Sequence, residues 1–170
     1  YEAIFPPTSN VNYLKKVLDF FVVWALLRRE VSAAFVLPLL EGWTEEQLLE
    51  YIAQYSKWFN SPVSGKYQLY HERLKVYLLS KVNENDIKNL ELKILNFGKR
   101  IFSNNEVLKF SKEHSIYFLK NYHTHLYFNS YKEKRSFELL EQFCLSDVIL
   151  VKSEIELGSF KYLLDANKLF

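Results

Sequence analysis

Glycine and proline are scarce in this chain, with four residues of each among 170. An all-β fold depends on these two residue types for its many tight turns, so their scarcity argues against such a fold. Hydrophobic residues make up 49% of the chain and charged residues 25%, which is an ordinary globular mixture and not that of a disordered segment. We therefore expect a mainly α-helical protein.

Cysteine, methionine and long apolar runs are also rare or absent. The single cysteine, Cys144, has no partner for an internal disulfide, which favours a reducing compartment and predicts a cytoplasmic location. The longest apolar runs, residues 20–27 and 33–40, are much shorter than the roughly 20 residues that a membrane-spanning helix needs, so we expect no membrane partner. Methionine is missing altogether, the initiator included, and we expect the chain to be a piece of a longer protein.

Charge of one sign is not in excess, because 22 basic and 20 acidic residues leave a net charge of +2. A nucleic-acid-binding domain usually carries a basic surplus, and none is visible in the composition.

The sequence also lacks a phosphate-binding loop, which needs several glycines followed by lysine and then serine or threonine. Gly65-Lys66 and Gly98-Lys99 each contain one glycine, and no serine or threonine follows the lysine. The lone cysteine opposes a zinc site. We predict no catalytic residue and no metal ligand, and hence no enzyme activity in this chain.

The first half of the chain predicts three helices, at residues 11–29, 33–40 and 45–59, from apolar residues at helical spacing. Ser32 is placed to cap the second helix. Thr44 and Gln47 have the spacing of a capping box, a hydroxyl at the cap and a glutamine three residues later.

A small hairpin and a fourth helix follow. The turn-rich residues 60–65 separate two short aromatic runs, and Tyr67 and Leu69 alternate with Gln68 as in a half-buried strand. A helix is then expected at residues 72–82. Three helices, a hairpin and a further helix are the order of a winged helix with one appended helix.

The second half predicts four consecutive amphipathic helices, at residues 86–97 (able to continue to residue 102), 115–128, 131–144 and 147–157. Their short connections favour an α-helical bundle or stacked helix pairs. We place the domain boundary within residues 82–86, which gives a winged-helix domain at 1–84 and a helical linker domain at 85–170.

Histidine and cysteine residues in the second half are the candidates for a reactive site. His123 and His125 are two residues apart and so point in different directions on a helix, with His123 on the apolar stripe and expected as a hydrogen-bonded histidine of the core or of an interface. Cys144 is best interpreted as a small buried hydrophobe. The sequence leaves open a Cys-His nucleophile made from Cys144 with His114 or His123.

The predicted third helix argues against DNA binding, although the corresponding helix of a helix-turn-helix protein enters the major groove. The residues at and near its start include four acidic ones: Glu41, Glu45, Glu46 and Glu50. Carboxylates that face a polyanion must be offset by cations, and the hairpin supplies only Lys57 and Lys66. A free-standing winged-helix DNA-binding or adaptor protein is therefore the alternative interpretation and not the preferred one.

Short motifs at residues 22–32, 42–48, 58–59 and 66–79 carry a resemblance to a known family. The last of them, which begins Lys66-Tyr67-Gln68-Leu69-Tyr70-His71-Glu72, is similar to a "YxLYHxxFxxYL" signature. In this order the motifs resemble the winged-helix region that follows the ATPase core in STAND-class NTPases, the NACHT and NB-ARC signalling proteins. Residues 117–126 and 137–140 resemble the helical linker that those proteins place before C-terminal WD or TPR repeats.

The resemblance implies a regulatory role in signal transduction, without catalysis in this part of the protein. The chain would relay between a nucleotide-binding core and a C-terminal sensor or repeat region of the same polypeptide, through protein-protein interaction. It also implies oligomerisation of the parent protein. ADP or ATP would bind in the parent, and this fragment would hold no cofactor of its own.

The resemblance also implies one candidate nucleotide-binding residue. Tyr70-His71-Glu72 falls where NB-ARC proteins carry Met-His-Asp, in which the histidine contacts the β-phosphate of ADP and stabilises the closed form. His71 is thus the candidate contact, although Tyr70 and Glu72 depart from the family pattern. The alternative is that His71 caps the helix or packs locally after the strand.

Overall fold

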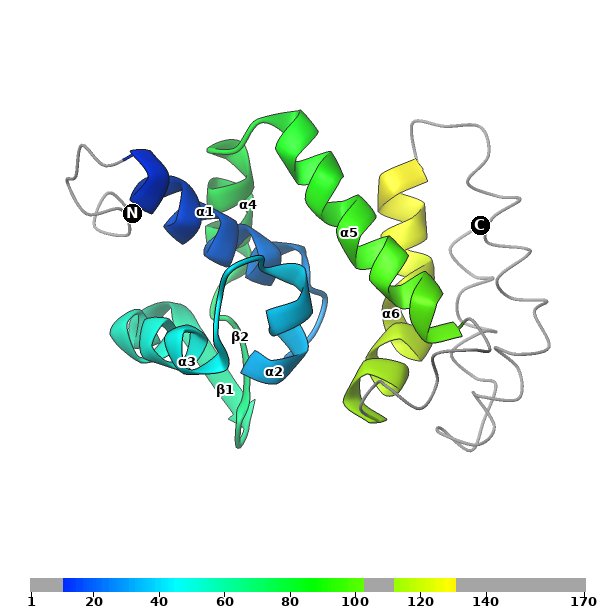
Figure 1. The fold of residues 1–170 in the computed structure, drawn as a ribbon, viewed down its shortest axis with the longest axis horizontal. Coiled ribbons are helices and arrows are strands. Elements are labelled where there is room, and N and C mark those ends of the chain that lie inside the picture. Colours follow the sequence, from blue (N-terminus) through cyan, green and yellow to red (C-terminus); the bar gives the residue numbers. More distant parts are fainter. Residues whose placement is uncertain (1–10, 103–111, 131–170) are drawn as a thin grey trace. The chain divides into compact units, whose positions relative to one another are not determined.

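The computed structural model describes residues 11–102 and 112–130 (Figure 1). These residues form six α-helices and one two-stranded antiparallel sheet, which confirms the expectation of a mainly helical protein. The chain divides into two compact units, residues 1–90 (unit 1) and 91–170 (unit 2). The division falls inside helix α5, and the predicted boundary between residues 84 and 85 lies at the start of the same helix. The predicted helices at 131–144 and 147–157 and the thiol of Cys144 lie outside the described residues.

Helix α1 (Val11–Leu26) is the central element of the unit 1 core. Its side chains from Phe20 to Leu26 are all buried, on every side of the helix. The helix ends at Leu26 and not near the predicted Arg29, because the chain turns to pair Val31 with the sheet. Val31 donates a backbone hydrogen bond to the Tyr67 carbonyl at 3.0 Å and accepts one from the Tyr67 amide at 2.8 Å.

Two capped helices follow. Helix α2 (Ala33–Val36) begins after Ser32, whose Oγ accepts a hydrogen bond from the Phe35 amide, and continues as a 3-10 turn at Leu37–Leu39. Helix α3 (Glu45–Gln54) begins with the predicted capping box, in which Thr44 and Gln47 exchange two hydrogen bonds of 3.2 Å. Helix α3 ends at Gln54 and not near residue 59, because a 3-10 turn at Ser56–Trp58 leads directly into a strand.

The sheet consists of β1 (Phe59–Val63) and β2 (Lys66–Leu69). Residues 60–63, predicted as part of a turn, belong to β1, and the turn itself is confined to residues 64 and 65, where Gly65 adopts a φ of 73°. The pairing is irregular between Asn60 and Val63, in the part of β1 that contains Pro62. Helix α4 (Glu72–Ser80) packs against α1 (Figure 1), with Leu74 and Leu78 buried.

The described helices that contribute to unit 2 are α5 (Glu84–Phe102) and α6 (Lys112–Ser130), both longer than the predicted cores of 86–97 and 115–128. In unit 2, α5 and α6 approach closely at Gly98. A Cβ atom at this position would lie 2.5 Å from Cδ1 of Phe118 and 2.6 Å from Cδ2 of Tyr122. Helix α6 is buried over most of its circumference, and this explains why its sequence shows only a weak apolar stripe.

Candidate functional sites

His71 lies between β2 and α4 and is the N-cap of α4. Its backbone is extended, and Nδ1 of the imidazole accepts a hydrogen bond from the Arg73 amide at 3.0 Å. Because Nδ1 is the acceptor, the neutral ring carries its proton on Nε2. The structure therefore shows the capping role that sequence analysis gave as the alternative, and leaves Nε2–H as a donor. The contact with a nucleotide phosphate stays a prediction.

The surroundings of His71 are exposed and contain groups that an anion could approach. Tyr70 is 68% exposed, and its ring centroid lies 6.4 Å from that of His71. The Arg73 side chain is exposed, whereas Glu72 forms an ion pair of 3.1 Å with Lys75. Helix N-termini carry a partial positive charge, so this end of α4 is compatible with a phosphate group.

The outer surface of α3 is acidic. Glu45, Glu46 and Glu50 are exposed, and Leu49 between them is 42% exposed. The helix contains no lysine or arginine that would balance these carboxylates. Glu45 and Glu46 lie in the first turn, where the helix dipole favours negative charge, so part of this pattern has a local structural reason.

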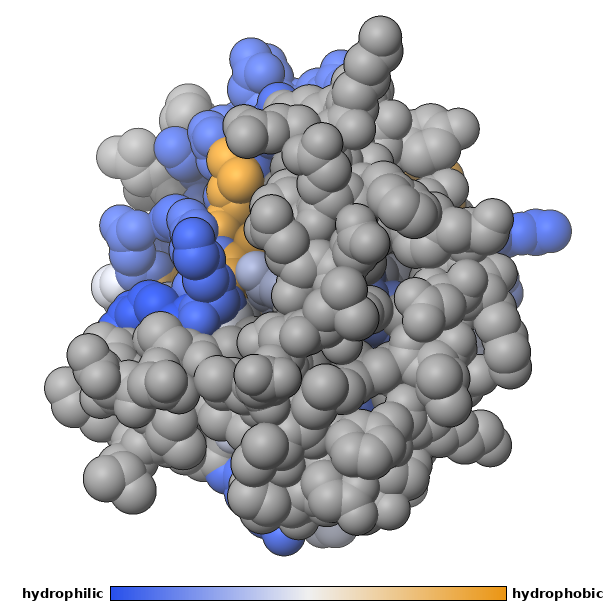
Figure 2. Space-filling model, turned by 90° about the vertical axis from the view of Figure 1, so that its right-hand side faces the viewer, coloured by the Kyte–Doolittle hydropathy of each residue, from blue (hydrophilic) through white to orange (hydrophobic). Residues whose placement is uncertain are grey.

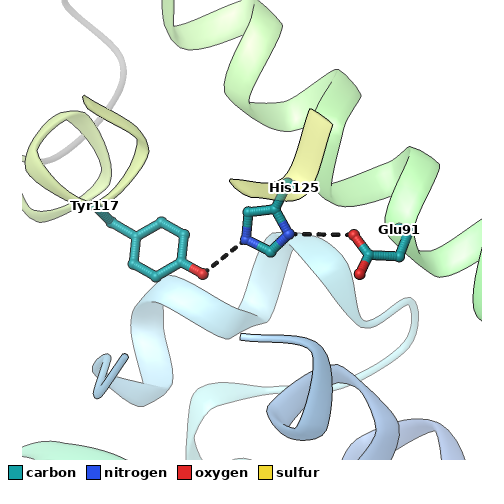
Figure 3. Close-up of polar contacts among 3 residues, drawn as sticks. All are labelled: Glu91, Tyr117 and His125. Atoms are coloured by element: carbon teal, nitrogen blue, oxygen red, sulfur yellow. Dashed lines mark hydrogen bonds and ion pairs between the residues drawn. The ribbon is translucent and has the colours of Figure 1, made fainter. Parts of the chain in front are cut away.

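A buried polar chain connects α5 and α6 in unit 2 (Figure 3). Nδ1 of His125 lies 3.1 Å from Oε2 of Glu91, and Nε2 of His125 lies 2.9 Å from the Tyr117 hydroxyl. The carboxylate can only accept, so neutral His125 donates through Nδ1–H and accepts the Tyr117 O–H at Nε2. His125 is fully buried, and Glu91 and Tyr117 are nearly so.

A carboxylate, an imidazole and a hydroxyl in this order resemble the arrangement that activates a nucleophile. Here the tyrosine is 5% exposed, and with the tautomer inferred above its hydroxyl donates to a buried imidazole. The arrangement as described therefore connects α6 to α5 and does not present a reactive oxygen to solvent. Buried polar chains of this kind are stabilising when every member is satisfied.

His123 is buried, as the sequence predicted, with 8% of its surface exposed. Among the described residues its buried Nδ1 has no hydrogen-bond partner, so the expected hydrogen bonding is not found at this nitrogen. Burial lowers the pKa of His123, and the nearby His125 lowers it further. Burial also raises the pKa of the neighbouring Tyr122 to about 12. His114 places its ring edge-on to Phe97 at 5.2 Å, and its pairing with Cys144 stays untested.

Glu91, Tyr117 and His125 were given no role from the sequence, although a signal was present. Glu91 lies four residues after Ile87 and three before Ile94, so a charged residue interrupts the predicted apolar stripe. Tyr117, Asn121 and His125 are spaced by four residues, which places three polar groups on one face of a helix. Polar residues at core positions usually bond to one another, and their shared faces could have indicated this chain.

The remaining observations give no further site in the described parts. Within residues 11–102 and 112–130, no group of three or more metal-ligating side chains could bind an ion, and no helix has the length and hydropathy to cross a membrane. Figure 2 shows mainly hydrophilic residues in the described part of one face, with hydrophobic residues in a narrow strip. Comparison with protein-family models, curated proteins and solved structures gives no match.

Proposed function

We propose that the chain is a non-catalytic coupling region of a STAND-type NTPase, made of a winged-helix domain at residues 1–84 and a helical linker domain at 85–170. Its role would be mechanical: it docks on the ATPase core in one nucleotide state and swings away in the other. A C-terminal sensor or repeat region would control oligomerisation of the parent through this movement.

The observation that carries the proposal is the pairing of Val31 with Tyr67. This bridge adds a short extended segment to the free side of β2, between α1 and α2 in chain order. The resulting order of helix, extended segment, two helices and a paired hairpin is the one that we would expect of a winged helix. It supports the resemblance at the level of topology, independently of the short sequence motifs.

The position of His71 supports the nucleotide part of the proposal. Its cap bond orients the imidazole and keeps the proton on Nε2, at an exposed helix N-terminus. A histidine held in this way can donate a hydrogen bond to a phosphate oxygen of a nucleotide on the ATPase core. The cap and the phosphate contact use different ring nitrogens and are compatible.

Two substitutions at His71 separate these two roles. In the full-length parent, His71→Ala and His71→Asn should both weaken ADP retention, because both remove the imidazole donor. The loss of this hydrogen bond to phosphate costs about 1.5–3 kcal/mol of binding free energy, which corresponds to roughly a ten- to hundredfold weaker affinity for ADP. In the fragment, His71→Ala should lower the free energy of unfolding by about 0.5–2 kcal/mol, whereas asparagine, itself a good N-cap, should restore it. Release of a fluorescent ADP analogue and thermal unfolding measure the two effects.

The phosphate-contact role is wrong if ADP retention is unchanged in both variants while only the alanine variant loses stability. The open reading frame around this chain tests the proposal separately. It should encode a phosphate-loop ATPase before Tyr1 and repeats after Phe170.

A DNA-binding winged helix is the second candidate, favoured by the same topology and opposed by the acidic surface of α3. We expect the dissociation constant for duplex DNA to be no tighter than the non-specific level, roughly 10⁻⁴–10⁻⁶ M at physiological salt. Fluorescence anisotropy measures it, and the triple variant Glu45→Gln, Glu46→Gln, Glu50→Gln is the matched control. Nanomolar, sequence-dependent binding by the unmodified chain would favour the DNA-binding function instead.

A further inference from the structure

Helix α3 carries an exposed leucine surrounded by carboxylates. Leu49 is 42% exposed. The helix has 3.6 residues per turn, so the positions four and three before Leu49, one after it and four after it lie on the same side of α3. These positions are all exposed and hold three acids and an alanine: Glu45, Glu46, Glu50 and Ala53. We call this set, with Leu49, the acidic face of α3.

Helix α5 repeats the arrangement with charge of the opposite sign. Leu92 is 40% exposed. The four corresponding positions around it are again all exposed and hold two lysines and two asparagines: Lys88, Asn89, Lys93 and Asn96. Two further exposed cations, Lys99 and Arg100, follow about two turns after Leu92. We call these residues together the basic face of α5.

Each face carries charge of one sign. Helix α3 contains no lysine or arginine that would reduce the negative charge of its face. From Ile87 to Phe102, α5 contains one acidic residue, Glu91, which is buried and bonded to His125. The exposed charges of this part of α5 are therefore all positive.

Charge complementarity selects one pairing between two copies of the chain. Two acidic faces repel each other, and so do two basic faces, because like charges brought together across an interface are unfavourable. An acidic face against a basic face brings opposite charges together and removes Leu49 and Leu92 from water. A second copy thus supplies a surface of matching size and opposite charge to either face.

We propose that copies of this chain associate through the acidic face of α3 in one molecule and the basic face of α5 in another, with Leu49 and Leu92 at the centre of the contact. Each molecule carries both faces, so one contact leaves one face of each kind for a further contact. The association is independent of the nucleotide contact proposed for His71, and its failure would leave the expected effects on ADP retention unchanged.

The salt dependence of self-association is the first test. The faces are small and mainly polar, so we expect a weak, reversible complex. Sedimentation equilibrium of the full chain at concentrations up to about 1 mM detects dissociation constants of that order. Raising the salt concentration from about 0.1 M to about 1 M shortens the Debye length from about 10 Å to about 3 Å and should weaken the association at least about tenfold. A chain that stays monomeric at the lower salt concentration, or whose association does not respond to salt, overturns the proposal.

Exchanging the charges assigns the contact to these two faces. Variant A makes the face of α3 basic, by Glu45→Lys, Glu46→Lys and Glu50→Lys. Variant B makes the face of α5 acidic, by Lys88→Glu, Lys93→Glu and Lys99→Glu. Each variant then carries two faces of like charge, and each alone should associate at least about tenfold more weakly than the unmodified chain. An equimolar mixture of A and B restores opposite charges in every contact and should recover the association to within about threefold.

A control variant separates the position of the charges from the net charge. Lys15→Glu, Arg29→Glu and Lys81→Glu change the net charge as much as variant B does, at exposed positions on other parts of the chain, and should leave the association unchanged. If the lysines of variant A disturb α3, the glutamine variant of the same three residues replaces it and should also weaken the association.

Two results would contradict the proposed contact. One is a mixture of A and B that associates no better than either variant alone. The other is an unmodified chain that stays monomeric but binds duplex DNA and loses this binding in variant B, which would assign the basic face of α5 to nucleic acid.

Discussion

Replacing Phe20 by alanine should lower the free energy of unfolding of unit 1 by about 3–5 kcal/mol, the usual cost of truncating a fully buried aromatic side chain. No part of Phe20 is exposed to solvent. Its ring centroid lies 5.2–5.8 Å from four other aromatic rings: Phe21, Trp43, Tyr51 and Phe59. These rings come from α1, from α3 and the segment before it, and from β1, so the cavity would open where three parts of the chain meet.

Denaturant titration followed by tryptophan fluorescence measures this loss selectively, because Trp24, Trp43 and Trp58 all belong to unit 1. Val76→Ala is the matched control: this side chain is 63% exposed on α4, and its truncation should change stability by no more than about 0.5 kcal/mol. Phe20→Leu should show a smaller loss and serves if the alanine variant does not fold. A change below about 1 kcal/mol for Phe20→Ala would contradict the described core.

Substitution of Gly98 by alanine should destabilise unit 2 by about 1–3 kcal/mol, the usual range for overpacking a core. Helix propensity alone predicts the opposite sign, a gain of about 1 kcal/mol for alanine over glycine within a helix. The close approach of the Phe118 and Tyr122 rings decides the sign, because a Cβ atom 2.5 Å from a ring carbon forces α5 and α6 apart.

Protection from hydrogen exchange in residues 112–130 reports this effect, since unit 2 contains no tryptophan. Lys99→Ala changes the next, exposed residue of α5 and should have little effect. In the Gly98→Ala background, Phe118→Leu should cost less than it does alone, because the smaller side chain relieves the clash. A stabilised Gly98→Ala protein would mean that the two helices are not in close contact at this point.

The structural elements whose signals are local could be predicted from the sequence. The caps at Ser32 and Thr44 were predicted because each depends on residues no more than three positions apart. The ends of α1 and α3 were placed too late, because those helices end where the chain must reach the sheet, and the bridge between Val31 and Tyr67 joins distant residues. The helical spacing of apolar residues continues past these points, so the spacing alone does not reveal that pairing with the sheet ends the helix.

The same limit applies to the candidate sites. For His71, the local capping alternative was foreseen, because the acceptor and the donor are two residues apart. The bond between Glu91 and His125 spans 34 residues, and no spacing rule connects positions so far apart. The burial of His123 was predicted from periodicity, but whether its ring nitrogens are bonded depends on what surrounds it in space, and among the described residues its Nδ1 has no partner.

The proline in the outer strand of the hairpin limits what can be added to this sheet. Among the described residues, strand β1 pairs with β2 on one side only, and at Pro62 its backbone has no N–H to offer an incoming strand. The register of the β1–β2 pair is also irregular at this place, so the outer edge of β1 does not offer the regular spacing of N–H and C=O groups that an added strand needs. Many copies of this region could therefore be brought to high local concentration without the outer edges of their hairpins joining into an intermolecular sheet.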